Sequence, residues 1–472
     1  MTVTLTQIKQ ISGVTAFNYA WNGSNRALIF NPSLPAFVFD YAPGGSSVEA
    51  GLVVGSTAQA LYSGATGGSN LLANEVPMIF FTQYVLAGGG VCGYSGCMQN
   101  SSSACGPWFV SYNLQNNTYS QNCSAIPNNS ITSHLVDVVL DYTNQYLYMF
   151  FLDSTTGDGY GVLIFAVPFS SLATFLANLQ PPSSYKVAWI QPQNPPSGWH
   201  TYATTVVYYN GNFYIVGFDQ PSNYYYWIVQ YSSITWSSSF PSSAQLTGTI
   251  VEVYSGGGAY GGNSFLNYYV SNGQIVTEIL AYIPVNSTSN GSFSTIYIYS
   301  FNPSNNTPSQ LFSLTNAYAS LRSINMGGVI VFVQSPSNGT FYISAYDRKT
   351  NSYEQSQAIS GVLGVLISEP YYAIIFSGSP TNLTITTYQI LLDVVPAFVN
   401  VTYSNGTLSG QVVNLNGNQP LANVTVYLFT LATQGDDYSS GTQVTSTTTN
   451  SSGQFSFSIS QAGYYALKII QS

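Results

Sequence analysis

Short hydrophobic runs recur along nearly the whole chain. They are rich in Val, Ile, Tyr, Phe and Thr and are separated by clusters of Asn, Gly, Ser and Pro, a pattern typical of β-strands joined by turns. The clearest predicted strands are residues 136–141, 146–152, 162–167, 204–209, 212–218, 225–231, 295–299, 329–334, 341–346, 371–376 and 383–391. Helical periodicity is limited to 170–179 and, more weakly, 46–61. The pattern predicts an all-β protein.

Three predicted hairpins share one arrangement of residues. In each, a strand ends in an aromatic residue and Asn or Asp, followed by a polar turn and a second strand; the pairs are Tyr112-Asn113, Phe301-Asn302 and Tyr346-Asp347. Asn and Asp suit turns because their side chains bond nearby backbone amides. Further hairpins are predicted over 138–148, over 206–217, which contains an Asn-Gly turn, and over 324–331.

This repeat resembles the inner-to-outer hairpin of kelch-like β-propeller blades. The resemblance implies a β-propeller over residues 1–396, and the kelch period of about 50 residues leaves room for about seven blades, with six or eight also fitting. In such blades the turn needs Asn or Asp, and the aromatic residue packs between neighbouring blades.

Residues 397–472 contain a second ordered set of segments, at 407–413, 419–428, 445–457 and 463–469. This set resembles the carboxypeptidase-regulatory-like (transthyretin-like, Cna-B-like) β-sandwich, which implies a small spacer or docking domain. Ser452 stands before Gly453 where that family often has Asp, which weakens any metal or isopeptide role. Lys468 is expected to be a surface lysine of the last strand.

The chain carries few charges for its length. Of 472 residues only 5% are charged, with seven Lys and Arg, whereas 45% are hydrophobic; a typical soluble domain is about 25% charged. Intrinsic disorder is excluded because it needs low hydrophobicity and high net charge. Binding to nucleic acid is excluded because so few basic residues cannot follow a phosphate backbone.

Sequons for N-glycosylation offer another source of solubility. They begin at Asn22, Asn100, Asn116, Asn122, Asn128, Asn286, Asn290, Asn305, Asn338, Asn382, Asn400, Asn405, Asn423 and Asn450. In acid the carboxylates are neutral, so only Lys, Arg and His carry charge. Because this chain has few of these residues, its positive charges repel one another little in acid. The composition resembles that of surface and virion glycoproteins of thermoacidophilic archaea. We therefore expect a glycoprotein on the outside of a cell or virion.

All four cysteines lie in a Gly/Ser/Asn-rich stretch near 88–130, interpreted as an insertion into the propeller; they are Cys92, Cys97, Cys105 and Cys123. The spacing lacks the paired C-x₂-C knuckles of a zinc site. Two disulfides are expected in an outward-facing protein. The sequence leaves all three pairings open.

The sequence shows neither a signal peptide nor an apolar stretch long enough to span a membrane. An outward-facing composition without a leader fits a mature fragment, an unusual export route, or a virion protein assembled inside its host. The last is the most economical interpretation.

Candidate catalytic groups are sparse. Asp137, Asp141, Asp153 and Asp219 lie near predicted strand ends, where a propeller funnel could gather an acid pair, but such residues more often bond turn amides. The segment 153–159 is expected to be a hairpin turn rather than a calcium loop, and His134 and His200 lack metal-ligand spacing.

Two glycine runs carry no predicted chemistry, whereas two aromatic runs could stack on sugar rings if they were displayed on a face. Gly88–Gly90 and Gly256–Gly258 are interpreted as flexible loops because no lysine or helix follows them. Residues 224–227 and 268–269 are expected to pack between blades. We assign no catalytic, cofactor-binding or metal-binding residue.

The sequence predicts a non-enzymatic protein for attachment, recognition or assembly of an outer surface structure, on an archaeal virus or archaeal cell exterior. Its expected partners are other surface or capsid proteins, cell-surface glycans or a protein receptor. One alternative is a secreted carbohydrate-active enzyme with acids in the propeller funnel. Another is a purely architectural lattice or turret component.

Overall fold

A computed structural model describes most of the chain. The described residues are 1–15, 26–28, 36–41, 49–54, 58–62, 78–92, 105–122, 135–141, 144–153, 161–193, 202–209, 212–219, 224–231, 233–256, 264–271, 274–283, 294–302, 307–326, 329–337, 339–347, 350–368, 371–393, 395–414, 419–431 and 442–469. Within these ranges the structure is built from β-strands and one helix, α1 (Phe169–Asn178). None of this described structure contains a helix long and apolar enough to cross a bilayer.

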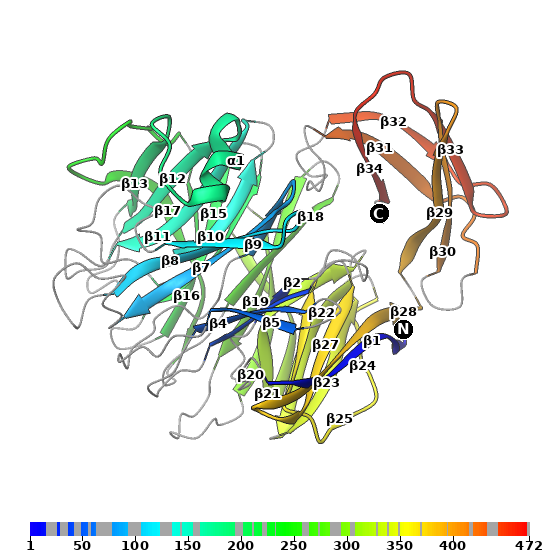
Figure 1. Ribbon diagram of the computed structural model, residues 1–472. Helices are drawn as coiled ribbons and strands as arrows, with labels where there is room; N and C mark the ends of the chain where they lie inside the picture. The colour runs from blue at the N-terminus through cyan, green and yellow to red at the C-terminus, as the bar shows by residue number, and fades with distance from the viewer. Residues whose placement is uncertain are drawn as a thin grey trace.

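After the first strand, which belongs to the last sheet, the chain forms two antiparallel sheets of four strands (Figure 1). The first contains β2 (Arg26–Leu28), β3 (Ala36–Tyr41), β4 (Glu49–Val54) and β5 (Ala58–Tyr62). The second contains β6 (Met78–Phe81), β7 (Tyr84–Cys92), β8 (Cys105–Asn113) and β9 (Thr118–Asn122). In both sheets the strands are neighbours in the order of the sequence, as in a meander.

The next two meanders meet at their outer strands in one eight-stranded sheet. One comprises β10 (Leu135–Asp141), β11 (Tyr146–Asp153), β12 (Gly161–Pro168) and β13 (Lys186–Gln193). The other comprises β14 (Tyr202–Tyr209), β15 (Asn212–Asp219), β16 (Tyr224–Tyr231) and β17 (Gln245–Gly256). The pairing of β13 with β17 is parallel, and all other pairings in this sheet are antiparallel.

A single long strand joins the following two meanders. These contain β18 (Ser264–Ser271), β19 (Gln274–Ile283), β20 (Ser294–Asn302), β21 (Thr307–Met326), β22 (Val329–Ser337), β23 (Thr340–Asp347), β24 (Ser352–Gln355) and β25 (Ile359–Ser360). The first part of β21 pairs with β20, and its second part pairs with β22. One backbone segment therefore serves as the outer strand of one meander and the inner strand of the next.

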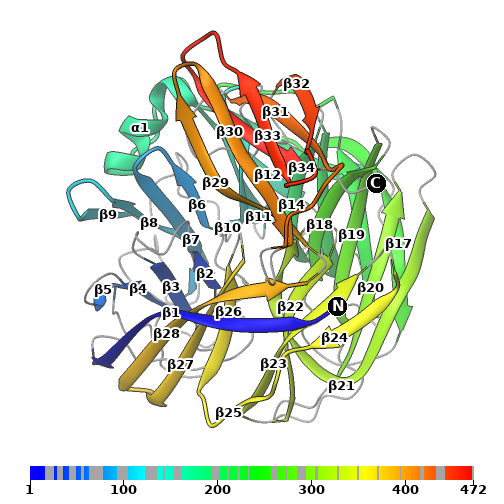
Figure 2. The ribbon, with the colours of Figure 1, turned by 90° about the vertical axis from the view of Figure 1, so that its right-hand side faces the viewer.

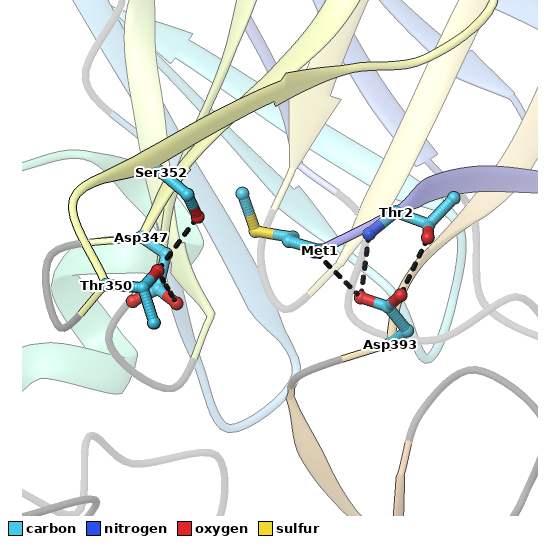
Figure 3. Close-up of polar contacts among 6 residues, drawn as sticks. All are labelled: Met1, Thr2, Asp347, Thr350, Ser352 and Asp393. Atoms are coloured by element: carbon cyan, nitrogen blue, oxygen red, sulfur yellow. Dashed lines mark hydrogen bonds and ion pairs between the residues drawn. The ribbon is translucent and has the colours of Figure 1, made fainter.

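The first strand of the chain completes the last meander. β1 (Val3–Val14) pairs with β28 (Asn382–Leu392), followed by β27 (Tyr372–Ser379) and β26 (Gly364–Ser368). Figure 2 shows β1 alongside β28, with the sheets arranged around a common centre. Beside this pairing, the Asp393 carboxylate accepts hydrogen bonds from the Thr2 backbone N–H at 2.7 Å and the Thr2 hydroxyl at 2.6 Å (Figure 3). The fold is an all-β propeller whose ring is closed by β1.

The hydrophobic core lies between the faces of adjacent sheets. Leu147, Met149 and Phe151 of β11 pack with residues of β6–β8, whereas Tyr148 and Phe150 of the same strand pack with residues of β15 and β16. Successive side chains of a strand point to opposite faces. Both faces of this sheet are therefore buried, which explains why its strands are continuous hydrophobic runs rather than alternating ones.

The end of the chain forms two further antiparallel sheets of three strands. β29 (Pro396–Ser404), β30 (Thr407–Asn414) and β33 (Gln454–Ser458) make one, and β31 (Thr425–Leu431), β32 (Thr442–Thr448) and β34 (Tyr464–Ile469) make the other. They enclose a core formed by Val412, Val426, Leu428, Phe455 and Phe457. The resemblance to the carboxypeptidase-regulatory-like sandwich and the boundary at 396/397 stay predictions, as do the kelch-like blade type and the blade number.

The eleven predicted strands and the helix at 170–179 are confirmed. Two expectations were wrong. The weak helix at 46–61 is instead β4 and β5, because β-branched Val53 and Val54 and the partner β3 favour a strand there. Gly88–Gly90 do not form a loop, because the unbroken ladder between β7 and β8 continues through them.

Candidate functional site

The strand register keeps the four acids that were the candidates for catalysis from all gathering at one point. Asp141 lies opposite Tyr146 on β11, and Asp153 lies seven residues further along that strand, about 23 Å away at the usual rise per residue. The Asp137 carboxylate bonds the backbone N–H of Val206, which is opposite Ile215 on β15. Asp219 lies four residues along β15 from Ile215, about 13 Å away at the same rise per residue. Acid pairs that cleave glycosides are about 5–10 Å apart. The four residues do not gather at one point.

Asp137 joins two neighbouring meanders. Its side chain is 5% exposed. One carboxylate oxygen accepts a hydrogen bond from the backbone N–H of Val138 at 2.9 Å, and the other accepts one from that of Val206, on β14, at 2.8 Å. The carboxylate therefore satisfies backbone donors of β10 and β14, which is a structural use of this buried acid.

Asp141 organises the turn between β10 and β11. It is fully buried, and it accepts hydrogen bonds from the Asn144 backbone N–H at 3.0 Å, the Asn144 side-chain amide at 2.8 Å and the Tyr148 hydroxyl at 3.3 Å. This confirms the expectation that a strand-end Asp bonds turn amides. The side chains of Asp153 and Asp219 lie outside the described residues.

The repeated aromatic–Asn/Asp motif forms the same turn twice. The Tyr112 hydroxyl donates to the Asn117 side-chain oxygen at 3.0 Å, and the Tyr346 hydroxyl donates to that of Asn351 at 2.9 Å. Both asparagines have positive φ, a conformation that Asn tolerates better than most residues. The third copy, at Phe301, pairs Asn302 with Thr307 in the β20–β21 hairpin.

Contacts around Tyr346 confirm the expected role of the motif's aromatic residue. The Phe312 ring, on the first part of β21, stacks on Tyr346 at 5.0 Å and on Tyr353 at 5.1 Å between ring centroids. Next to it, Asp347 accepts a hydrogen bond from the Thr350 hydroxyl at 2.7 Å (Figure 3). The motif thus closes a hairpin and packs it against the neighbouring meander.

The sequons differ in exposure. The described sequon asparagines are Asn116, Asn122, Asn382, Asn400, Asn405, Asn423 and Asn450. All of these except Asn122 are exposed. Asn122 is half-buried, and its side-chain nitrogen donates to the Leu179 carbonyl oxygen at 3.0 Å beside the end of α1. The other sequons lie outside the described residues.

Several other sequence candidates also lie outside the described structure. These are His134, His200, Cys97, Cys123, the segment 154–160 and the side chains of Cys92, Cys105 and residues 224–227 and 268–269. Asp153 and Gly161 pair across β11 and β12, as expected for a hairpin connection between them. Among the residues that the structure describes, no cluster of acids, histidines and cysteines has metal-site geometry.

An aromatic stack and an exposed strand edge were not predicted. The Tyr148 ring stacks with that of Tyr146 at 5.9 Å and with that of Trp236 at 5.4 Å between centroids, and the Lys186 ammonium lies 4.8 Å from the Tyr146 ring centroid. On β29, Val401 is 44% and Tyr403 63% exposed. The Tyr146/Tyr148 alternation hinted at the first feature, but Trp236 is brought in only by tertiary packing.

No protein-family model matches this chain, and no curated protein is similar in sequence. Puromycin hydrolase is similar in structure at 9% identity and a TM-score of 0.36, over 84% of this chain and 62% of that one, so this chain spans less than two thirds of its length. The periplasmic gluconolactonase of Pseudomonas aeruginosa is similar at 9% identity and a TM-score of 0.39, over 76% and 96% of the two chains. The β-propeller domain of the trilobed protease from Pyrococcus furiosus is similar at 9% identity and a TM-score of 0.26, over 66% and 93%. At such identities the likeness concerns the fold alone.

Proposed function

We propose that this protein is an extracellular or virion-surface glycoprotein whose propeller serves attachment, recognition or assembly of an outer surface structure. The supporting observation is the exposure of every described sequon asparagine except Asn122, on a fold with only 5% charged residues. Glycans at such positions would solubilise a surface that has few charges. Archaeal cell exteriors and archaeal virions are the proposed settings.

The positions of the acids favour binding over catalysis. Asp137 and Asp141 already accept hydrogen bonds from the fold's own donors, and the register keeps Asp141 far from Asp153. A rigid ring that carries variable loops is suited to binding glycans or proteins. The proposed partners are other surface or capsid proteins, cell-surface glycans or a protein receptor.

Glycopeptide mapping of protein from its native source, together with immunogold imaging of intact cells and particles, tests this function. We expect sugar on the exposed sequon asparagines, which are Asn116, Asn382, Asn400, Asn405, Asn423 and Asn450, and gold label on the outer surface. Asn122 is the internal control: its half-buried amide, bonded to Leu179, is expected to be unmodified. Unglycosylated protein confined to the cytoplasm would refute the proposal.

A further inference from the structure

The ladder between β7 and β8 reaches two of the four cysteines. Its register runs without a bulge from Tyr84 opposite Asn113 to Cys92 opposite Cys105. Cys92 is the last residue of β7 and Cys105 is the first residue of β8, so the two cysteines flank the segment 93–104. The backbone alone therefore places Cys92 and Cys105 directly across from each other.

The hydrogen-bonding pattern fixes which type of pair they form. In an antiparallel ladder, hydrogen-bonded and non-hydrogen-bonded pairs alternate. The Leu114 backbone N–H donates to the Gln83 carbonyl at 2.8 Å, which makes that position, one step before Tyr84 and Asn113, a hydrogen-bonded pair. Counting along the unbroken register makes Cys92 and Cys105 a non-hydrogen-bonded pair.

Pro107 gives an independent check of this count. It lies opposite Gly90, two positions from the cysteine pair, so the two pairs are of the same type. Proline has no backbone N–H to donate, so it is suited to a non-hydrogen-bonded position. The hydrogen bond from Leu114 and the position of Pro107 therefore give the same assignment of pair types along this ladder.

We propose that Cys92 and Cys105 form a disulfide. Non-hydrogen-bonded pairs have Cα atoms about 4.5 Å apart, which is inside the range of about 4.4–6.8 Å that disulfides span. Of the three pairings that the sequence left open, only this one joins Cys92 to Cys105, and it leaves Cys97 and Cys123 for each other. The bond would hold the ends of β7 and β8 together and close the segment 93–104.

The chemistry is a two-electron oxidation. The two thiols lose two protons and two electrons as the S–S bond forms. The oxidant is the disulfide of an oxidoreductase or of a small-molecule thiol, which is reduced to two thiols by thiol–disulfide exchange. This inference rests on the proposed exterior function, because disulfides persist outside the reducing cytosol.

Disulfide mapping of the intact protein tests the pairing. Free thiols are alkylated in denaturant without reductant, and the chain is then cut after Tyr94 with chymotrypsin and after Met98 with cyanogen bromide, which separates Cys92, Cys97 and Cys105. We expect a fragment containing Cys92 joined to a fragment containing Cys105. Linkage of Cys92 to Cys97 or Cys123 would overturn the proposal.

Protein refolded in a glutathione redox buffer separates this inference from the proposed function. Formation of the Cys92–Cys105 bond there supports the pairing whatever the native compartment is. Alkylation of both cysteines after that treatment overturns the pairing and leaves the exterior function standing. Location and glycosylation, measured separately on native material, decide the function.

Thiol titration of variants provides a second measurement. Cys105→Ser should free one thiol, on Cys92, and the double variant Cys92→Ser/Cys105→Ser should free none. The matched control Cys97→Ser should free one thiol, on Cys123, with Cys92 still protected. A free thiol on Cys92 in the Cys97→Ser variant would contradict the proposed pairing.

Discussion

Asp393 connects the two ends of the propeller ring through one side chain. Besides its two hydrogen bonds from Thr2, its carboxylate lies 3.9 Å from the Met1 amino group. Burial tends to raise the pKa of Asp393, but the bonds from Thr2 and the nearby ammonium outweigh it and hold the pKa below its usual range. The ionised carboxylate therefore stabilises the pairing of β1 with β28.

Replacing Asp393 with Asn should lower the free energy of unfolding by about 1 kcal/mol at pH 7, the size expected for partly exposed charge-assisted hydrogen bonds. Because the folded pKa is depressed, this stability is present above the unfolded pKa and is lost as pH falls through the folded pKa. Urea denaturation at pH 7 and at about pH 2 should therefore show a difference from wild type that vanishes in acid.

Thr2→Val is the matched control for Asp393→Asn. It removes the hydroxyl donor but keeps the backbone bond, so its effect should be smaller, and the double variant should be less destabilised than the sum of the two. A difference between wild type and Asp393→Asn that persists undiminished at low pH would show that the carboxylate's charge plays no part.

Among the elements, β29 is an unusual edge strand. It is the outer strand of its sheet, and its residues 400–404 are all exposed. Natural proteins commonly protect such edges with charges or proline, yet Val401 and Tyr403 are flanked here only by polar uncharged residues. The sequons at Asn400 and Asn405 bracket these two side chains. Glycans there would block edge-to-edge pairing.

The double variant Asn400→Gln/Asn405→Gln, made in a glycosylating host, should self-associate at least about tenfold more tightly, a change of about 1.4 kcal/mol. Analytical ultracentrifugation measures this directly. Asn382→Gln, which removes an exposed sequon at the β27–β28 turn of the propeller, should leave association unchanged. Equal association of all three proteins would show that these glycans do not guard the edge.

Local pattern predicted the strands whose side chains are buried on both faces, such as β11 and β22, because their hydrophobic runs are continuous. It missed β29, whose Asn, Thr and Ser suit turns; its pairing with β30 makes it a strand. The structural role of Asp141 was predictable because its partners are local. That of Asp137 was not, because its bond to Val206 crosses 69 positions of the chain.

At the scale of the whole molecule, the terminal pair of sheets has its own hydrophobic core, distinct from the three described clusters between the propeller sheets. Gly453 lies in the turn before β33 with a φ of 72°, and a Cβ there would meet the Val412 carbonyl oxygen. Gly453 is therefore a position at which the terminal core can be perturbed alone.

Gly453→Ala should destabilise the terminal sheets by about 2 kcal/mol through left-handed strain and the clash with Val412. Differential scanning calorimetry should then show one unfolding transition lowered and the other unmoved. Gly339→Ala, with a φ of 76° in the propeller and no atom near the added Cβ, should produce a smaller shift in the other transition. A single transition that moves with both variants would show that the two parts unfold together.

The closure of the ring by β1 also sets the order of events during synthesis. β1 ends at Val14 and its partner β28 begins at Asn382, so at about 5–20 residues per second the ribosome needs about 20 to 70 seconds to make the partner. During that time β1 has no strand to pair with. A chain that stops before β28 therefore leaves β1 unpaired, even where the sheets between the two strands have folded.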